Sequence, residues 1–241
     1  MTGIILAAGS GRRIKIHKPK GMLNIGGKPL IEYSIRNLQR AGVDRIIIVT
    51  GFHSEIYETH FEDREGITLV HNSEYANCGS LHSLHTALSS MDDDDVVILD
   101  SDILYNWDEF SHFMQSRFKN AILATNVPDG RNDACYLEMD LADHLVKVSK
   151  NINCVNLGND EPWEYIGITK SSRESLAQIR AYIEEKYSST GSIDHEYDYV
   201  FESIETKYNI LKYPDYIWSE ADDNQQLAYM VNLVYPKINL C

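Results

Sequence analysis

A glycine-rich loop followed by a cluster of cations lies near the start of the chain. The loop reads Leu6-Ala7-Ala8-Gly9-Ser10-Gly11-Arg12-Arg13, and Lys15, Lys18 and Lys20 follow it. Two glycines in three residues allow backbone N–H groups to approach a ligand without a Cβ in the way. Successive N–H groups, together with Arg and Lys side chains, neutralise phosphate oxygens. In a chain of formal net charge −14, this local positive charge indicates a polyphosphate ligand.

The spacing of the loop distinguishes it from two common nucleotide-binding motifs. A Walker loop requires G-x-x-x-x-G-K-[ST], which this stretch lacks. A dinucleotide fingerprint requires a third glycine where Ile14 stands. What remains is L-A-A-G-x-G-x-R, followed by P-K at Pro19 and Lys20. This pattern resembles the signature of the nucleotidylyltransferases, which join an NTP to a phosphorylated small molecule and release pyrophosphate.

Two aspartates are candidate metal ligands. Asp102 follows the apolar run 96–99, and Asp222 lies in the polar stretch 218–223. Because an open parallel sheet delivers ligands to the carboxyl ends of its strands, Asp102 and the glycine loop can share one site. Mg²⁺ prefers one or two carboxylates together with phosphate oxygens. Two other interpretations stay open, namely Asp102 as a turn residue and Asp222 as the N-cap of the last helix.

The elements that must position these residues alternate between strands and helices in the first half of the chain. Continuous apolar runs predict buried strands at 3–6, 45–50, 67–71 and 96–99. Ile31, Ile35 and Leu38 recur at helical spacing and predict a first helix that ends at Ala41-Gly42. A short helix is predicted over 53–61, and Leu81, Leu84 and Leu88 mark another. Pro29 suits the first turn of the first helix. The alternation predicts an α/β fold with a doubly wound, mostly parallel, Rossmann-like sheet.

The pattern changes from about residue 119. Short strands are predicted at 121–125, 134–138, 144–148, 163–168 and 208–212, and helices at 171–186, 193–204 and 222–234. No low-complexity linker or internal repeat divides the chain. We therefore expect a single domain over residues 1–241. Its nucleotide-binding half spans 1–118, and a more β-rich acceptor-binding half spans 119–241 and covers the carboxyl ends of the sheet.

Composition argues against several classes of partner and location. Asp and Glu outnumber Lys and Arg by 36 to 22, which argues against nucleic acid or an anionic membrane surface. No apolar run approaches the roughly 18 residues that span a bilayer. A strand at 3–6 argues against a signal peptide, and the four cysteines are too dispersed for a zinc site or a disulfide framework. We therefore expect a cytoplasmic protein with small-molecule partners.

Further motifs resemble the phosphocholine cytidylyltransferase group, which includes 2-aminoethylphosphonate cytidylyltransferases. They occur in the order seen in that group: Asn72-Ser73-Glu74-Tyr75, Gly79-Ser80-Leu81-His82-Ser83-Leu84, Leu99-Asp100-Ser101-Asp102, Val148-Ser149-Lys150, Trp163-Glu164-Tyr165-Ile166-Gly167, Tyr197-Asp198 and Glu220-Ala221-Asp222. The match covers nearly the whole chain and is strongest over residues 1–105. The chain departs from the pattern at Gly79-Ser80, where many relatives carry paired asparagines.

The resemblance implies a role for each candidate residue. Asp102 and Asp222 correspond to ligands of Mg²⁺, Arg13 to a triphosphate contact and Lys20 to an α-phosphate contact. We assign the last two to catalysis. The expected nucleotide-binding residues are Leu6, Ala7, Ala8, Gly9, Ser10, Gly11 and Arg12, with Gly79 and Ser80 beside the base. The expected substrates are CTP and a small phosphorylated or phosphonate acceptor.

The reaction implied by the resemblance needs no dedicated base. An ionised oxygen of the acceptor attacks the α-phosphorus in line, so catalysis reduces to positioning and charge neutralisation by Mg²⁺, Lys20 and Arg13. A cationic head group such as choline or aminoethyl favours carboxylates and aromatic faces, which Glu164, Tyr197 and Asp198 supply.

Three questions stay open at this point. Lys150 either steers the phosphate of the acceptor or is a solvated lysine. A sugar-1-phosphate nucleotidylyltransferase is the alternative function, because sugar hydroxyls would use the same carboxylates as hydrogen-bond acceptors. A nucleotide-sensing domain without turnover is a third interpretation, although the joint presence of Arg13, Lys20, Asp102 and Asp222 argues against it. The sequence does not give the oligomeric state.

Overall fold

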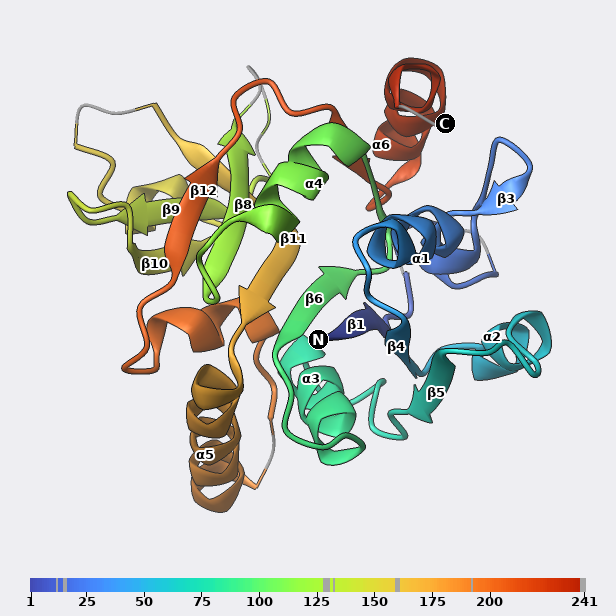
Figure 1. Cartoon of the computed structure of the whole chain (residues 1–241), viewed down its shortest axis with the longest axis horizontal. Helices are drawn as coiled ribbons and strands as arrows, with labels where there is room; N and C mark the ends of the chain where they lie inside the picture. Colours follow the sequence, from blue (N-terminus) through green and yellow to red (C-terminus); the bar gives the residue numbers. More distant parts are fainter. Residues whose placement is uncertain are drawn as a thin grey trace.

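Four apolar runs of the first half form neighbouring parallel strands in a nine-stranded sheet (Figure 1). They are β1 (Thr2–Ala7), β4 (Arg45–Thr50), β5 (Ile67–His71) and β6 (Val96–Asp100). Because β1 pairs with both β4 and β6, its carboxyl end lies next to theirs. The computed structural model of the chain describes residues 1–11, 13, 14, 17–127, 131, 133–158, 161–191 and 193–238.

The long strand β11 (Trp163–Ser171) joins the two halves of the sheet. It runs antiparallel to β6 on one side and to β8 (Ala121–Asn126) and β9 (Tyr136–Met139) on the other. β10 (Leu145–Ser149) pairs with β9, and β12 (Asn209–Lys212) runs parallel to β8. The predicted α/β fold class is therefore confirmed, with a parallel first half and antiparallel pairing around β11.

Helices cover both faces of the sheet. α1 (Ile31–Arg40), α2 (Ser54–His60) and α4 (Trp107–Gln115) pack on one face, and α3 (Ser80–Ser89) and α5 (Arg173–Thr190) lie side by side on the other. Successive residues of β1 divide between these two cores, since Ile4 packs with α3 and Ile5 packs with α1. Side chains alternate along a strand, so burial on both faces requires an apolar residue at every position.

Two predicted helices differ from those in the structure. Pro29 lies in the hairpin formed by β2 (Asn24–Ile25) and β3 (Lys28–Pro29), so its predicted place in the first turn of α1 is wrong. The predicted helix over 193–204 is only a 3-10 helix, Tyr197–Glu202. Residues 193–195, at the start of the predicted helix, instead bind the start of α3. The carbonyl of Ile193 accepts the N–H of Gly79 at 3.1 Å, and the carbonyl of His195 accepts the N–H of Leu81 at 3.0 Å.

A small two-stranded ladder brings the C-terminal segment to the end of β6. β7 (Ile103–Tyr105) pairs antiparallel with β13 (Trp218–Glu220), and the N–H of Ala221 donates to the carbonyl of Asp102 at 2.8 Å. After β13 the chain continues through α6 (Asn224–Tyr229), a π-helical turn (Met230–Val234) and a 3-10 turn (Tyr235–Lys237). The ladder places residue 222 beside residue 102.

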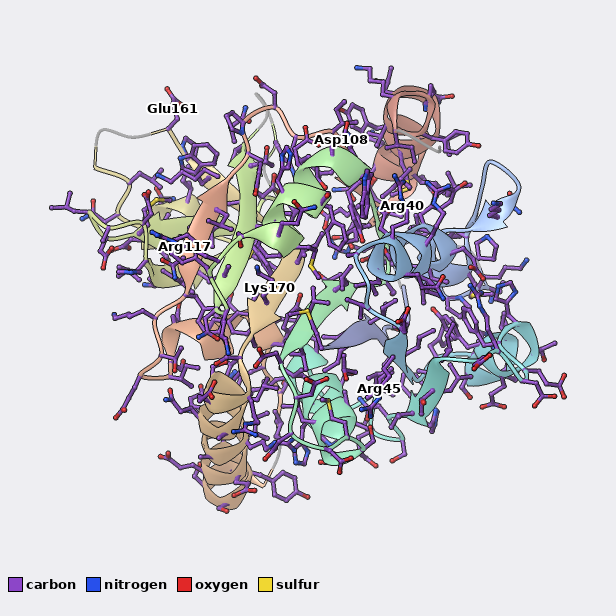
Figure 2. All side chains as sticks on the ribbon, in the orientation of Figure 1. Arg40, Arg45, Asp108, Arg117, Glu161 and Lys170 are labelled. Atoms are coloured by element: carbon purple, nitrogen blue, oxygen red, sulfur yellow. The ribbon has the colours of Figure 1, made fainter. Side chains whose placement is uncertain are left out.

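A buried lysine attaches α4 to β11. Nζ of Lys170, labelled in Figure 2, donates to the carbonyl of Phe113 at 2.9 Å and to the hydroxyl of Ser116 at 2.8 Å. Carbonyls at the end of a helix lack intrahelical partners, and a cation there is favoured. Burial lowers the pKa of Lys170 to about 8.

None of the described helices is long and apolar enough to cross a bilayer.

β11 contains an irregularity at Gly167 next to the end of β6. The register with β8 shifts between Tyr165 and Thr169, and Gly167 has a φ of +81°. A Cβ at this position would overlap the carboxyl group of Asp100. Bulges of this kind bend a strand beside a binding site. The missing side chain therefore leaves room for the Asp100 carboxyl.

Gly167→Ala should lower the free energy of unfolding by roughly 2–4 kcal/mol, because left-handed strain and overpacking add at this position. Gly191→Ala is the matched control, since Gly191 has a φ of +71° with open space around it. The control should lose only about 1–2 kcal/mol. Urea unfolding of both variants measures the difference. Equal losses would show that the close approach to Asp100 has no energetic weight.

Candidate active site

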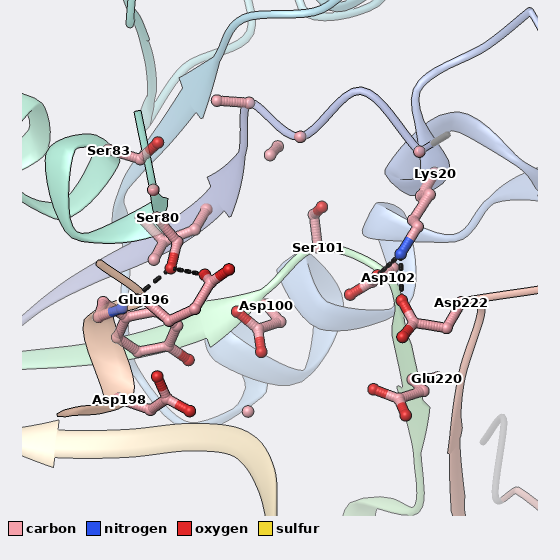
Figure 3. A pocket seen from close by; sticks show the side chains of 18 of the residues that line it. Lys20, Ser80, Ser83, Asp100, Ser101, Asp102, Glu196, Asp198, Glu220 and Asp222 are labelled. Carbon is pink, nitrogen blue, oxygen red and sulfur yellow. Dashed lines mark hydrogen bonds and ion pairs between the residues drawn. The ribbon is translucent and has the colours of Figure 1, made fainter. Parts of the chain in front are cut away.

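The carboxyl ends of β1 and β6 open into a pocket of about 550 Å³ (Figure 3). It is lined by every predicted site residue that the structure describes: Leu6, Ala7, Ala8, Gly9, Ser10, Gly11, Arg13, Lys20, Gly79, Ser80, Asp102, Lys150, Glu164, Tyr197, Asp198 and Asp222. The predicted nucleotide contact Arg12 lies outside the described residues. Residues from both halves of the chain thus meet in one pocket, although their individual roles stay predictions.

The glycine loop shapes the entry of Lys20 into the pocket. Gly11 has a φ of +57°, and a Cβ there would lie 3.2 Å from Cγ of Lys20. Lys20 begins a 3-10 turn (Lys20–Met22) directly after Pro19. The aliphatic part of Lys20 therefore runs along the loop, and its ammonium group lies beyond the loop in the pocket.

Lys20 bridges the two predicted metal ligands. Its Nζ lies 2.7 Å from Oδ2 of Asp102 and hydrogen-bonds Oδ1 of Asp222 (Figure 3). Arg13 approaches the other oxygen of Asp222 at 2.6 Å. Burial disfavours the Lys20 ammonium, but the two carboxylates outweigh burial and raise its pKa above the usual value. Burial likewise opposes ionisation of Asp222, whereas Lys20 and Arg13 outweigh it and lower the pKa of that carboxyl.

The N-cap interpretation of Asp222 is wrong, because the next residue fills that position. The Asp223 carboxylate accepts the N–H groups of Gln225 and Gln226, each at 2.8 Å, and so caps α6. The backbone N–H of Asp222 donates to the side chain of Gln226, while the Asp222 carboxylate faces the two cations. Asp222 is therefore available to the pocket.

Arg131, which the sequence did not single out, neutralises the far wall of the pocket. Its guanidinium contacts Glu164 at 3.1 Å, binds Glu220, and lies 5.0 Å from the centre of the Trp218 ring. Glu164 is 1% exposed, and its Oε2 has no hydrogen-bond partner among the described residues. Burial raises the pKa of Glu164 to about 7 against the opposing effect of Arg131.

Glu220 shares this environment. Burial, and then repulsion from Asp222, raise the pKa of Glu220 to about 8, again against Arg131. The sequence offered a signal for Glu220, which belongs to a motif with Asp222. It offered none for Arg131, which precedes β9 in a polar connection.

A second carboxylate of the predicted acceptor region lies on the 3-10 helix Tyr197–Glu202. Asp198 accepts a hydrogen bond from the thiol of Cys135 at 3.2 Å, and burial raises the pKa of the carboxyl. The hydroxyl of Tyr197 lies 2.7 Å from that of Tyr165, so its polar end is engaged within the protein. Burial opposes the charge of Lys150, but Glu196 and Asp198 outweigh it and raise the pKa of that lysine.

The first turn of α3, predicted to lie beside the base, is bound to the segment before that 3-10 helix. The hydroxyl of Ser80 donates to Glu196 and accepts the N–H of Tyr197 at 2.9 Å (Figure 3). The N–H of Gly79 is likewise bound to a backbone carbonyl. Both residues line the pocket, but their polar groups also hold the two halves together.

The described lining of the pocket is strongly acidic. Its carboxylates are Asp100, Asp102, Asp133, Glu164, Glu196, Asp198, Glu220 and Asp222, whereas its cations are Arg13, Lys20 and Lys150. Anionic phosphates can enter such a pocket only if positive charge accompanies them. Oxygens of Asp133, Glu220 and Asp222 lie within 4.8 Å of one another, while Asp102 shares Lys20 with Asp222. Carboxylate oxygens in this arrangement suit a hard divalent cation.

Glu164 and Glu220 should make the protein without nucleotide less stable as the pH rises from about 4.5 to 8. Their raised pKa values mean that the folded state retains protons that the unfolded chain releases in this range. This contribution is complete below pH 4.5 and is lost as the pH passes the folded-state pKa values. Glu220→Gln should flatten the dependence in urea unfolding between pH 5 and 9. The exposed Glu58→Gln is the control, and an unchanged slope in the Glu220 variant would contradict the assignment.

Comparison with known proteins agrees with this geometry. Residues 3–186 match the family model described as a MobA-like NTP transferase domain. The chain is 26% identical over 192 residues to the 2-aminoethylphosphonate cytidylyltransferase of Lancefieldella rimae, covering 78% of this chain and 74% of that protein. It is 33% identical over 109 residues to the choline-phosphate cytidylyltransferase of Streptococcus pneumoniae, covering 44% of this chain and 47% of that protein.

A solved structure shows the same fold. The CTP:phosphocholine cytidylyltransferase from Streptococcus pneumoniae aligns with a TM-score of 0.77 and 22% identity, covering 95% of this chain and 96% of that one. The family model and the two cytidylyltransferase relatives confirm the family resemblance predicted from the motifs. Because the family model matches residues 3–186, the chain belongs to the MobA-like NTP transferase family and is a nucleotidyltransferase.

Proposed function

We propose that the protein is a magnesium-dependent cytidylyltransferase that transfers CMP from CTP to a small phosphate or phosphonate bearing a cationic head group. The observation that carries the proposal is a single pocket with two different ends. The glycine loop with Lys20 and Arg13 forms one end, and an acidic, tyrosine-containing wall around Glu164 and Asp198 forms the other. Relatives named as cytidylyltransferases support CTP as the nucleotide.

The phosphate end suits nucleotidyl transfer. The triphosphate would lie over the glycine loop, with Lys20 and Arg13 neutralising its oxygens. An ionised oxygen of the acceptor attacks the α-phosphorus. The bond between the α-phosphorus and the oxygen that joins it to the β-phosphorus breaks, and pyrophosphate leaves. Asp102 and Asp222 would hold Mg²⁺, which neutralises phosphate charge and acts as a Lewis acid. Because the acceptor oxygen is already ionised, no side chain has to remove a proton.

The acidic end suits a cationic acceptor. With eight carboxylates and three cations in the described lining, a positively charged head group reduces the charge imbalance. Lys150 interacts electrostatically with Glu196 and Asp198, and we propose that it meets the phosphate or phosphonate of the acceptor. A sugar-1-phosphate nucleotidylyltransferase is the alternative, since the carboxyl groups of Glu164 and Asp198 could also accept hydrogen bonds from sugar hydroxyls.

Pyrophosphate release tests the proposal directly. ATP, CTP, GTP and UTP are each assayed with phosphocholine, 2-aminoethylphosphonate and glucose-1-phosphate. We expect turnover with CTP and a cationic acceptor. Preference for another NTP would overturn the nucleotide assignment, and preference for the sugar phosphate would establish the alternative.

Asp102→Asn and Asp222→Asn should each lower kcat about 100-fold, or about 3 kcal/mol, because each removes a charge that holds the metal while keeping its shape. The neighbouring Asp223→Ala is the matched control. It should lower stability by about 1 kcal/mol through loss of the α6 cap, with kcat unchanged. Steady-state kinetics and thermal unfolding separate the two effects. Normal turnover of Asp102→Asn at saturating Mg²⁺ would rule out its metal role.

Asp198→Asn should weaken the binding of a cationic acceptor by about 2 kcal/mol, roughly 30-fold in the dissociation constant. The reason is that a cation held between a carboxylate and aromatic faces loses its counter-charge. Glucose-1-phosphate, whose sugar head group is uncharged, should lose about 1 kcal/mol of binding free energy or less. Isothermal titration of each acceptor, with a non-hydrolysable CTP analogue present, measures both. Exposed Asp194→Asn is the control, and CTP-analogue affinity should be equal in all three proteins. Equal losses for the two acceptors would contradict a cationic site.

A further inference from the structure

The pocket already contains a cation at the point where the two predicted metal ligands converge. Nζ of Lys20 lies 2.7 Å from Oδ2 of Asp102 and also binds Oδ1 of Asp222 (Figure 3). The Lys20 side chain is 17% exposed, as are both carboxylates. Arg13 takes the second oxygen of Asp222 from a more exposed position, since its side chain is 63% exposed.

We propose that Lys20 holds the place of the metal ion in the protein without nucleotide, so that the metal and the NTP bind together. The inference rests on the proposed metal role of Asp102 and Asp222. Mg²⁺ would need the same oxygens at about 2.0–2.1 Å, whereas the ammonium group now hydrogen-bonds them. Because two cations cannot share this position, metal binding requires Lys20 to leave.

When Lys20 leaves the two carboxylates, its ammonium group can move toward the glycine loop. Its stem passes close to Gly11, where a Cβ would lie 3.2 Å from Cγ, so the loop and the carboxylates are both within reach of one flexible side chain. A lysine ammonium is a compact charge on four methylenes and can change partner by rotation about its own bonds. Phosphate oxygens over the loop would replace the two carboxylates as its partners.

This exchange links the two ligands. Without an NTP, a metal ion must displace the ammonium group from the two carboxylates that bind it, with no new partner of equal geometry for the lysine, which is unfavourable. With an NTP, the carboxylates bind the metal and Lys20 binds phosphate, so both cations have anionic partners. Metal alone should therefore bind weakly, and the NTP should strengthen it. The resulting order prevents the carboxylates from holding a metal in the wrong geometry before the phosphates arrive.

Mn²⁺ binding without nucleotide, followed by electron paramagnetic resonance, tests the proposal. Lys20→Met should bind Mn²⁺ about tenfold more tightly than the wild type, within the usual range of coupling between ligands. Lys20→Arg, which retains the charge, should show no gain. Arg13→Met is the matched electrostatic control, because it removes a positive charge from the same Asp222 without opening the bridging position. Its gain should be much smaller.

The outcomes separate this inference from the proposed function. A Lys20→Met protein that binds Mn²⁺ no more tightly than Arg13→Met overturns the place-holding role, even if Asp222→Asn still loses turnover. A Lys20→Met, Asp222→Asn double variant should lose the gain. If the double variant keeps it, the metal binds elsewhere and the proposed metal ligands are wrong. Circular dichroism checks folding, and Lys20→Gln replaces the Met variant if that protein does not fold.

Discussion

Repulsion among carboxylates is the constraint on which this pocket depends. Strand ends and short helices bring acidic side chains together there, and three cations from separate segments lie among them. Lys20 binds Asp102 and Asp222, Arg131 binds Glu164 and Glu220, and Lys150 interacts with Glu196 and Asp198. Lys20 follows the glycine loop, Arg131 precedes β9, and Lys150 follows β10. In a low-dielectric pocket, an uncompensated pair of like charges is costly. Burial is the largest cause of the raised pKa values of Glu164 and Glu220, and Arg131 opposes it at both carboxyls.

The parallel half of the fold was predictable because its strands are buried on both faces. A strand such as β1 is a nearly continuous run of apolar residues, and that signal is local in the sequence. The β7–β13 ladder gives no such signal, since each strand has three residues and more than a hundred residues separate them. The proximity of Asp222 to Asp102 therefore could not be derived from periodicity, although the family resemblance implied it.

Side-chain roles at element ends were harder to predict. Asp222 and Asp223 are adjacent and chemically identical, so only the backbone geometry reveals that Asp223 is the cap. The sequence predicts a helix that includes residues 193–196, but hydrogen bonds to the start of α3 hold them in another conformation. Arg131 is a single cation in a polar connection, and its three acidic partners come from other segments and from its own. Tertiary contacts decided each of these cases.

β11 belongs to both halves of the sheet, and this has a consequence for the size of substrate that the pocket accepts. One strand carries Glu164 in the acidic wall of the pocket and Gly167 beside Asp100 at the end of β6. At about 3.3 Å per residue, the strand fixes these points about 10 Å apart. No hinge lies between them along this strand. On the proposed function, the spacing along β11 would help to set the length of acceptor that fits between these two points.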